Sequence, residues 1–245
     1  MKTLVIIPSR LSATRLPGKP LLKISGLSII THVFRKAVKA NIGEVYVAAE
    51  DQEIIDDVRQ NGGQAILTNK QHKTGTDRIY GALKKIGTKD VQLIMNLQGD
   101  EPLMDVEDIR NLHSQMIKLK SELGTLASNI TDQNLYKEKN IVKVVTKESL
   151  DISKFPEAIN FMRIVKNPNK NIYHHLGIYC YQLETLEKFI SLNQSNNEIK
   201  NKLEQLRALD NNIKINVSRA KKSPIGVDTI EDFVAIKKLM EYKSS

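Results

Sequence analysis

Two hydrophobic patterns alternate along the N-terminal part of the chain. Short runs such as 3–8 and 91–97 are apolar at almost every position, which is typical of strands buried on both faces of a parallel sheet. Between such runs, apolar residues recur at helical spacing. The predicted elements, in chain order, are a strand at 3–8, a helix at 30–40, a strand at 44–49, a helix at 50–60, a strand at 64–68, a helix at 76–86 and a strand at 91–97.

This alternation predicts an α/β fold with a doubly wound, mostly parallel sheet, because each crossover must lay its helix against the sheet. Ligands in such folds bind beyond the carboxyl ends of the strands. We therefore expect the loops after Ile7 and after Leu97 to face the same crevice.

From Gly124 onward the pattern changes, since apolar strands follow one another with little helix between them. This favours hairpins or an inserted, smaller mixed sheet. The predicted elements are strands at 124–130, 141–146, 158–163 and 176–182, helices at 184–192 and 201–209, a strand at 214–220, a turn at 224–226 and a helix at 229–242, with 193–197 as a polar loop.

Length and composition describe an ordinary globular protein of 245 residues, 40% hydrophobic and 27% charged. The chain has no apolar run near the roughly 20 residues that span a bilayer, and its apolar N-terminal stretch is too short for a signal peptide. We expect a cytoplasmic protein without a membrane partner. The one cysteine, Cys180, lies in an apolar run and is predicted to be a buried structural thiol, which argues against zinc.

The formal charge of +9 indicates anionic partners, but the excess is mostly lysine spread over predicted helix faces. A solvated lysine-rich surface is favoured over nucleic-acid binding, because dense basic clusters with interleaved aromatic residues are missing from the sequence.

Three cations occur in the loop that leaves the first strand: Arg10, Arg15 and Lys19. Guanidinium and ammonium groups suit a triphosphate, and Gly18 lets the backbone approach an anion closely. A rigid, solvated loop is the alternative. Pro20 follows Lys19 where a Walker A loop needs Ser or Thr, and the strand is followed by no Gly-x-Gly-x-x-Gly, so ATPase and NAD-type functions lose support.

Two aspartates are candidate metal ligands. Asp100 directly follows an apolar strand, where a carboxylate could hold magnesium against phosphate oxygens. Asp228 precedes the last helix, and Glu231 follows three residues later. Taken alone, this spacing favours a capping box, with Asp228 as the helix N-cap.

Several collinear motifs resemble those of the 3-deoxy-manno-octulosonate cytidylyltransferase (CMP-KDO synthetase) family. They are Pro8-Ser-Arg10 with Ser12-x-Thr14-Arg-Leu-Pro-Gly-Lys-Pro-Leu21, Thr74-Gly-Thr-Asp-Arg78, Gln98-Gly-Asp-Glu-Pro102, His175-Leu-Gly-Ile-Tyr179, Leu203-Glu-Gln-Leu-Arg207 and Gly226-Val-Asp-Thr229. Because these blocks cover nearly the whole chain in the family's order, chance resemblance is improbable.

The resemblance implies an enzyme with the nucleotide-diphospho-sugar transferase type of fold that transfers CMP from CTP to 3-deoxy-D-manno-octulosonate (KDO), an acidic eight-carbon sugar, for the inner core of lipopolysaccharide. It implies one domain over 1–245, with 1–123 mainly binding CTP and 124–245 mainly binding the sugar and forming a homodimer. Mg²⁺ is the implied cofactor.

The resemblance also implies residue roles. Arg10, Lys19 and Asp100 would be catalytic, and Asp100 and Asp228 would hold the metal. The implied nucleotide-binding residues are Pro8, Ser9, Arg10, Arg15, Lys19, Thr76, Arg78 and Asp100, and the implied sugar-binding residues are Gln98, Arg163, His175, Tyr179, Glu204 and Gln205.

Some positions leave alternatives open. Asp77 stands where the family usually has glutamate, and the segment after Arg163 departs from the family's proline-rich loop. His175 could be an exposed turn residue, Arg163 a surface strand residue, and Glu204 and Gln205 ordinary helix-surface residues. The competing functions are a CMP-sugar synthetase for 8-amino-KDO or a sialic-type acid, and a non-catalytic α/β binding module.

Overall fold

The computed structural model describes residues 1–12, 15–72, 74–168, 170–223 and 225–242. The chain forms two compact units. Unit 1 comprises 1–107 and 224–245, and unit 2 comprises 108–223. These boundaries differ from the expected functional division at 123/124, which concerns ligand binding and stays a prediction.

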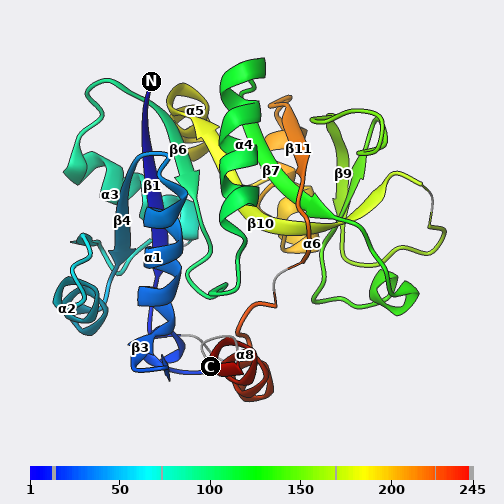
Figure 1. The fold of residues 1–245 in the computed structure, drawn as a ribbon. Coiled ribbons are helices and arrows are strands. Elements are labelled where there is room, and N and C mark those ends of the chain that lie inside the picture. The colour runs from blue at the N-terminus through cyan, green and yellow to red at the C-terminus, as the bar shows by residue number, and fades with distance from the viewer. Residues whose placement is uncertain (13–14, 73, 169, 224, 243–245) are drawn as a thin grey trace. The chain divides into compact units, whose positions relative to one another are not determined.

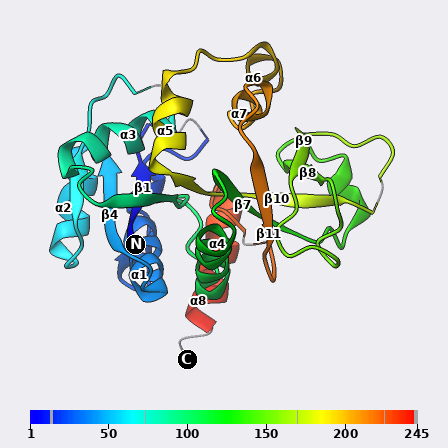
Figure 2. The same ribbon diagram turned by 90° about the horizontal axis from the view of Figure 1, so that it is seen from above.

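Unit 1 contains a parallel sheet with the strand order β6–β1–β4–β5. Its strands are nearly continuous apolar runs, as expected for a sheet that is covered on both faces: Leu4 to Ile7 in β1 are fully buried. Figure 2 shows α1 and α3 on opposite sides of β1 and β4. The strands are β1 (Lys2–Ser9), β4 (Glu44–Ala49), β5 (Ala65–Leu67) and β6 (Val91–Asn96), and the helices are α1 (Ile29–Ala40), α2 (Gln52–Gln60) and α3 (Gly75–Ile86).

The last helix, α8 (Ile230–Tyr242), completes unit 1 (Figure 1). Ile236 on this helix packs into a small apolar cluster with Ile24, Ile29 and Val227. Ile24 belongs to a hairpin of β2 (Lys23–Ile24) and β3 (Leu27–Ser28), which follows the short 3₁₀ helix η1 (Lys19–Leu21). The C-terminal helix therefore supports the segment that carries Lys19.

Unit 2 contains a mixed sheet. Strand β7 (Leu123–Ser128) pairs in parallel with β11 (Ile215–Arg219) and antiparallel with β10 (Ile172–Gln182). Strand β8 (Lys143–Thr146) pairs antiparallel with β10 and with β9 (Ala158–Met162). The remaining elements are α4 (Val106–Leu119), which begins at the end of unit 1, the 3₁₀ helix η2 (Gln133–Tyr136), α5 (Leu183–Ser191), α6 (Asn196–Asn201) and α7 (Leu206–Asp210).

The predicted fold class is confirmed, and the departures are local. Helix α4 and the β2–β3 hairpin were not expected from the sequence. The loop predicted at 193–197 instead runs into α6, because Ser195 and Glu198 form a capping box there. Helix α7 is shorter than the predicted 201–209, since Lys202 adopts a left-handed conformation that ends α6.

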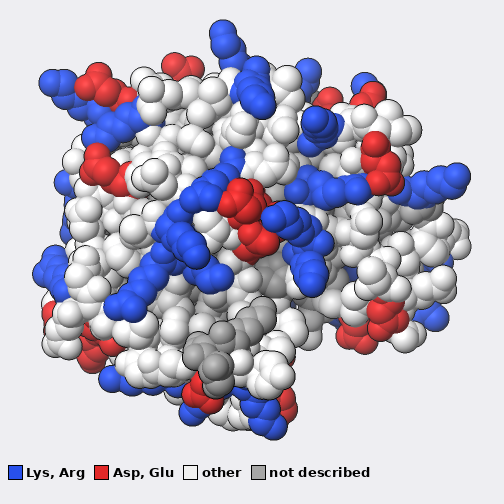
Figure 3. Space-filling view, in the orientation of Figure 1, with Lys and Arg blue, Asp and Glu red and all other residues white. Residues whose placement is uncertain are grey.

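Lysine and arginine side chains stand at many separate places on the face drawn in Figure 3, several of them beside acidic groups. The positive charge is thus distributed over this face. None of the described helices is both long enough and apolar enough to cross a membrane. Cys180 is buried, as predicted, and burial raises the pKa of its thiol far above the usual range.

Candidate active site

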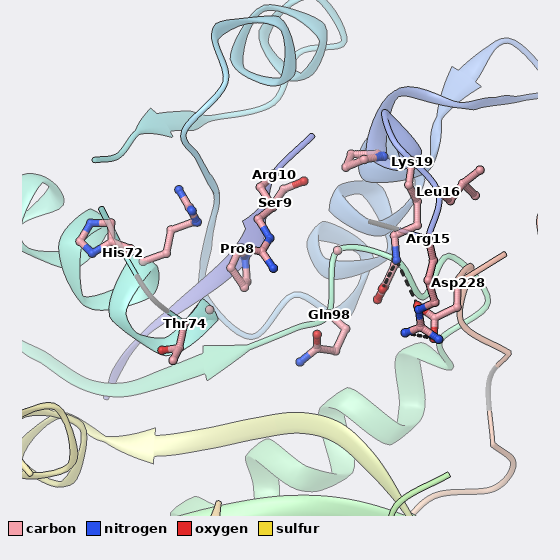
Figure 4. Close-up of a pocket in the computed structure, with 15 residues that line it drawn as sticks. Pro8, Ser9, Arg10, Arg15, Leu16, Lys19, His72, Thr74, Gln98 and Asp228 are labelled. Carbon is pink, nitrogen blue, oxygen red and sulfur yellow. Dashed lines mark hydrogen bonds and ion pairs between the residues drawn. The ribbon is translucent and has the colours of Figure 1, made fainter. Parts of the chain in front are cut away.

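A pocket of about 370 Å³ opens in unit 1 where β1 and β6 end (Figure 4). Its walls are formed by the loops after these two strands, by the start of α3 and by Asp228. The lining residues are Pro8, Ser9, Arg10, Arg15, Leu16, Lys19, Pro20, His72, Thr74, Gly75, Arg78, Gln98, Gly99, Asp100 and Asp228. The expectation that the loops after Ile7 and Leu97 face one crevice is confirmed.

The loop after β1 is held at defined points. The backbone N–H of Leu11 donates to the Asp51 carboxylate at 2.7 Å, and that of Gly18 donates to the Leu11 carbonyl at 3.1 Å. Gly18 has φ +71°, a conformation that suits glycine, and it precedes η1 directly. These contacts place the cations of the loop at the pocket. Thr14, which belongs to the loop motif, lies outside the described residues.

Lys19 contacts both candidate metal ligands. Its Nζ lies 2.7 Å from Oδ2 of Asp100 and 3.4 Å from Oδ1 of Asp228, and its side chain is only 13% exposed. Arg15 contacts the other oxygen of Asp228, Oδ2, at 3.1 Å (Figure 4). Two aspartates that are 128 positions apart thus share one cation. The third cation of the loop, Arg10, is exposed at the pocket and forms no ion pair with a described residue.

The predicted capping box at Asp228 and Glu231 is wrong. The reciprocal bonds join Thr229 and Asp232 instead: the Asp232 N–H donates to Thr229 Oγ1 at 3.2 Å, and the Thr229 N–H donates to Asp232 Oδ2 at 2.9 Å. Because Thr229 caps the helix, the side chain of Asp228 is available to the pocket. The acidic start of α8 concealed which residue was the cap.

A third acidic residue, Glu101, lies beside these aspartates. Its Oε2 is buried and has no hydrogen-bond partner among the described residues. Burial, together with the charges of Asp100 and Asp228, raises the pKa of Glu101 to about 8. At neutral pH the Glu101 carboxyl is therefore mostly protonated, so two carboxylates face the two cations Lys19 and Arg15.

The opposite side of the pocket contains a buried arginine. Arg78 is 3% exposed, donates to Thr68 Oγ1 at 2.8 Å and forms an ion pair with Glu50. The preceding Thr74 caps α3 in a capping box with Asp77, which gives Asp77 a structural role. Thr76 is buried and is not among the lining residues, whereas Arg78 is.

His72 is a lining residue that the sequence did not single out. A Cβ atom built on Gly81 would meet its imidazole Nε2 at 2.4 Å, so the ring packs on the glycine in α3. Burial, and then the charge of Arg78, lower the pKa of His72. A signal was available, because His72 lies only two positions before the Thr74–Arg78 motif.

The donor set at the pocket fits a divalent cation. Carboxylate oxygens are preferred ligands of Mg²⁺, which is usually held by one or two protein carboxylates together with substrate phosphates. Oxygens of Asp100 and Asp228 already converge on a single positive atom, the Nζ of Lys19. The described residues contain no group of three or more His, Cys, Asp or Glu residues arranged for a metal, so phosphates and water would complete such a site.

Of the residues expected to bind the sugar, Gln98 lines the pocket of unit 1 and the other five belong to unit 2. His175 is 6% exposed within β10 and shares a hydrogen bond of 2.9 Å with Thr125 Oγ1, so the alternative of an exposed turn histidine is wrong. Its ring lies 5.5 Å from that of Tyr179. Burial raises the pKa of Tyr179, and the charge of Glu204 adds to this shift.

Arg163 lies just beyond β9 and links backbone segments of unit 2. Its guanidinium donates to the backbone carbonyls of Asn201 at 2.9 Å, Lys202 at 2.8 Å and Lys139 at 3.0 Å. Glu204 and Gln205 lie two and three positions after Lys202, and Gln205 is 8% exposed. Arg163, Glu204 and Gln205 thus lie together at the segment 201–205 of unit 2, and His175 lies beside Tyr179, on which the charge of Glu204 acts.

The chain is similar to known proteins along nearly its whole length. Residues 4–215 match the family model described as cytidylyltransferase. The "3-deoxy-manno-octulosonate cytidylyltransferase" of Paramagnetospirillum magneticum is 37% identical over 97% of each chain, and that of Rhodopseudomonas palustris is 39% identical over 98% of each. A solved structure of CMP:2-keto-3-deoxy-manno-octonic acid synthetase complexed with CTP matches with a TM-score of 0.90 and 33% identity, covering 99% of this chain and all of that one. The chain therefore belongs to the 3-deoxy-manno-octulosonate cytidylyltransferase family of enzymes.

Proposed function

We propose that the protein transfers CMP from CTP to KDO and releases pyrophosphate. One observation carries the proposal: in a pocket that also holds Arg10 and Arg15, the Lys19 ammonium lies within 3.4 Å of two carboxylates from distant parts of the chain. Such a site can neutralise a triphosphate and hold a divalent ion beside it. The names of the relatives and of the CTP-bound neighbour give the same reaction.

The nucleotide would lie across the pocket of unit 1. Arg10, Arg15 and Lys19 would bind the triphosphate, with Pro8 and Ser9 beneath it at the end of β1. The hydroxyl of Ser9 supports a bound triphosphate at this place. Its Oγ is buried and has no hydrogen-bond partner among the described residues, so a phosphate oxygen could provide one. Arg78 and Thr76, at the start of α3, would shape the side that receives the base.

Asp100 and Asp228 would hold Mg²⁺. A bound magnesium ion supplies positive charge to phosphoryl oxygens and lowers the pKa of a hydroxyl that touches it. The chain's own part is to place two carboxylates from separate segments on one cation, which the contacts of Lys19 support.

In the reaction, the anomeric hydroxyl oxygen of the sugar would attack the α-phosphorus of CTP in line. A new O–P bond forms as the bond from the α-phosphorus to the pyrophosphate oxygen breaks, and the hydroxyl proton leaves to solvent. Lys19 and Arg10 would stabilise the negative charge on the phosphoryl oxygens, while the pocket holds the triphosphate in position. We assign no side chain as general base.

The other parts of the function are proposals of the same kind. Gln98, Arg163, His175, Tyr179, Glu204 and Gln205 would handle the sugar acid. The neutral imidazole of His175 would act as a hydrogen-bonding group, since burial and the neighbouring His174 lower its pKa to about 3. We further propose a cytoplasmic homodimer whose product enters the inner core of lipopolysaccharide.

A pyrophosphate-release assay tests the reaction. The purified protein is given CTP and Mg²⁺ with KDO, 8-amino-KDO or a sialic acid, and each sugar is also tested with UTP. We expect release with CTP and KDO together and background release when either is omitted. A stronger signal with 8-amino-KDO or sialic acid would replace the proposed acceptor, and background release with every acceptor would favour a non-catalytic binding module.

A further inference from the structure

The side chain of Lys19 is held by the two carboxylates assigned to the metal. Its Nζ is 2.7 Å from Asp100 Oδ2, which is shorter than the 3.4 Å to Asp228 Oδ1. The lysine side chain is 13% exposed, against 31% for Asp100 and 43% for Asp228. A carboxylate pair that would otherwise repel is therefore bridged by an internal ammonium group.

The backbone of Lys19 is fixed by hydrogen bonds, whereas its ammonium group stands at the end of a flexible four-carbon stem. Its N–H donates to the Leu16 carbonyl at 3.2 Å, and its own carbonyl accepts from the Leu22 N–H at 3.2 Å. Pro20 stiffens the same turn. The four-carbon stem between this anchor and the ammonium allows Nζ to reach either the carboxylates or a neighbouring phosphate without a change in the loop.

An ammonium group and a divalent ion compete for these oxygens. Mg²⁺ takes oxygen ligands at about 2.0–2.1 Å, so an ion bound to Asp100 and Asp228 would lie against Nζ, and like charges so close repel each other. Of the two aspartates, Arg15 pairs with Asp228 and not with Asp100, so it does not remove the repulsion between Nζ and the metal. Lys19 must move away before the metal can bind well.

We propose that Lys19 is an internal counter-ion that occupies the metal-binding carboxylates of the nucleotide-free protein and transfers to the triphosphate when the nucleotide arrives. This inference rests on the proposed function. Metal and triphosphate binding are then coupled: the triphosphate draws the ammonium off the carboxylates, and the metal takes its place. Because such coupling is reciprocal, the metal also strengthens nucleotide binding.

Mn²⁺ binding to the nucleotide-free protein tests the inference without measuring activity. Free Mn²⁺ is followed by electron paramagnetic resonance for the wild type, Lys19→Met and Lys19→Gln. The matched control is Lys23→Met, which removes the same charge from an exposed position four residues away. We expect both Lys19 variants to bind Mn²⁺ at least about 10-fold more tightly than wild type, and Lys23→Met to match wild type. Equal or weaker Mn²⁺ binding in folded Lys19 variants overturns the inference.

A second measurement follows the nucleotide. Calorimetric titration of CTP in the presence of EDTA should give an affinity about 10-fold lower for Lys19→Met than for Lys23→Met. The reason is that the triphosphate can no longer form an ion pair with the Lys19 ammonium group. An unchanged CTP affinity would overturn the transfer step. Adding Asp100→Asn to Lys19→Met should abolish the tight Mn²⁺ site; if it does not, the carboxylates are not the metal ligands, and the metal assignment of the proposed function fails instead.

Discussion

The carboxylate of Glu50 and the guanidinium of Arg78 form a buried ion pair beside the nucleotide pocket. The Arg78 side chain is 4% exposed and that of Glu50 12% exposed. Thr68 accepts a further hydrogen bond from Arg78. The start of α3 and the end of β4 are therefore joined through charges that water does not screen well.

Breaking this pair should destabilise the fold. Glu50→Gln leaves the Arg78 charge buried without a counter-ion, so we expect a loss of about 3 kcal/mol in the free energy of unfolding. Chemical denaturation measures the loss, and the exposed Glu53→Gln on α2 is the matched control. A loss in Glu50→Gln no larger than in Glu53→Gln would show that the pair is dispensable for stability. The KM for CTP should also rise, because Arg78 lines the pocket.

Asp228→Asn should remove turnover and leave the fold intact. The helix cap is formed by Thr229 and Asp232 and does not depend on the Asp228 carboxylate, whose ion pairs with Lys19 and Arg15 are partly exposed and contribute little to stability. We expect turnover to fall at least about 10²-fold, since one of the two proposed metal ligands loses its charge. Pyrophosphate release measures this, with Glu231→Gln as a control that changes the same charge three residues further on. Near-normal turnover in Asp228→Asn would contradict the metal assignment.

Gly99 is placed where a side chain would collide with the first strand. A Cβ there would lie 2.9 Å from the Pro8 carbonyl oxygen and 3.2 Å from Ile30 Cδ1. Gly99→Ala should therefore displace the loop that carries Asp100, lowering stability by about 1–3 kcal/mol and turnover by about 10²-fold. Thermal denaturation and pyrophosphate release measure the two effects.

Gly75→Ala is the matched control for stability. Its Cβ would lie 3.5 Å from Pro8 Cγ, an ordinary contact, and alanine favours the helix that starts there. Its melting temperature should equal or exceed that of the wild type. If both alanine variants behave alike, close packing at Gly99 is not what fixes the loop.

Most of unit 1 was predictable from sequence because one simple pattern governs it. Buried parallel strands need apolar residues at every position, and the predicted strand at 44–49 coincides with β4. Unit 2 was harder, since its boundaries depend on local capping. Ser195 and Glu198 begin α6 inside a stretch whose asparagine content predicted a loop.

The site was predictable as a set of residues but not as a set of contacts. The motifs pointed to Lys19, Asp100 and Asp228, but no spacing rule places two aspartates 128 positions apart on one ammonium group. The same limit applies to Glu101, whose burial follows from tertiary packing. The prediction that Asp228 caps the last helix failed for a local reason. Thr229 is an equally good capping residue by sequence, and its hydrogen bond with Asp232 makes it the cap.

Lys143 is a fully buried lysine whose three donors are all used. Its Nζ donates to the backbone carbonyls of Glu138 at 2.7 Å, Ile141 at 2.8 Å and Arg163 at 2.7 Å. Lys143→Met would leave three carbonyls without this donor, and we expect a loss of about 3 kcal/mol or more by chemical denaturation. The exposed Lys147→Met should lose little. A stable Lys143→Met would mean that the surrounding loops find other partners.

Two adjacent histidines in β10 should make the protein sensitive to acid. Burial, with the charge of Lys143, lowers the pKa of His174 to about 4, and burial with His174 lowers that of His175 to about 3. His174 Nδ1 lies 2.7 Å from Ser223 Oγ, and the His175 ring faces Phe161 and Tyr179. Both imidazoles are therefore neutral at pH 7 and resist protonation while the protein is folded.

In the unfolded chain, both histidines bind protons below about pH 6.5. Between that pH and the lower folded-state pKa values each of these histidines binds more protons in the unfolded state, so their contribution to stability falls as the pH falls. Glu101, with its pKa raised to about 8, acts in the opposite direction over the same range. From pH 7 to pH 5 each histidine should lower the free energy of unfolding by about 2 kcal/mol, at 1.36 kcal/mol per pKa unit. Urea denaturation at several pH values measures this, and between pH 7 and pH 5 His175→Asn should lose about 2 kcal/mol less stability than the wild type, because one histidine contribution is removed. An equal slope in His175→Asn and wild type would show that another group controls the acid response.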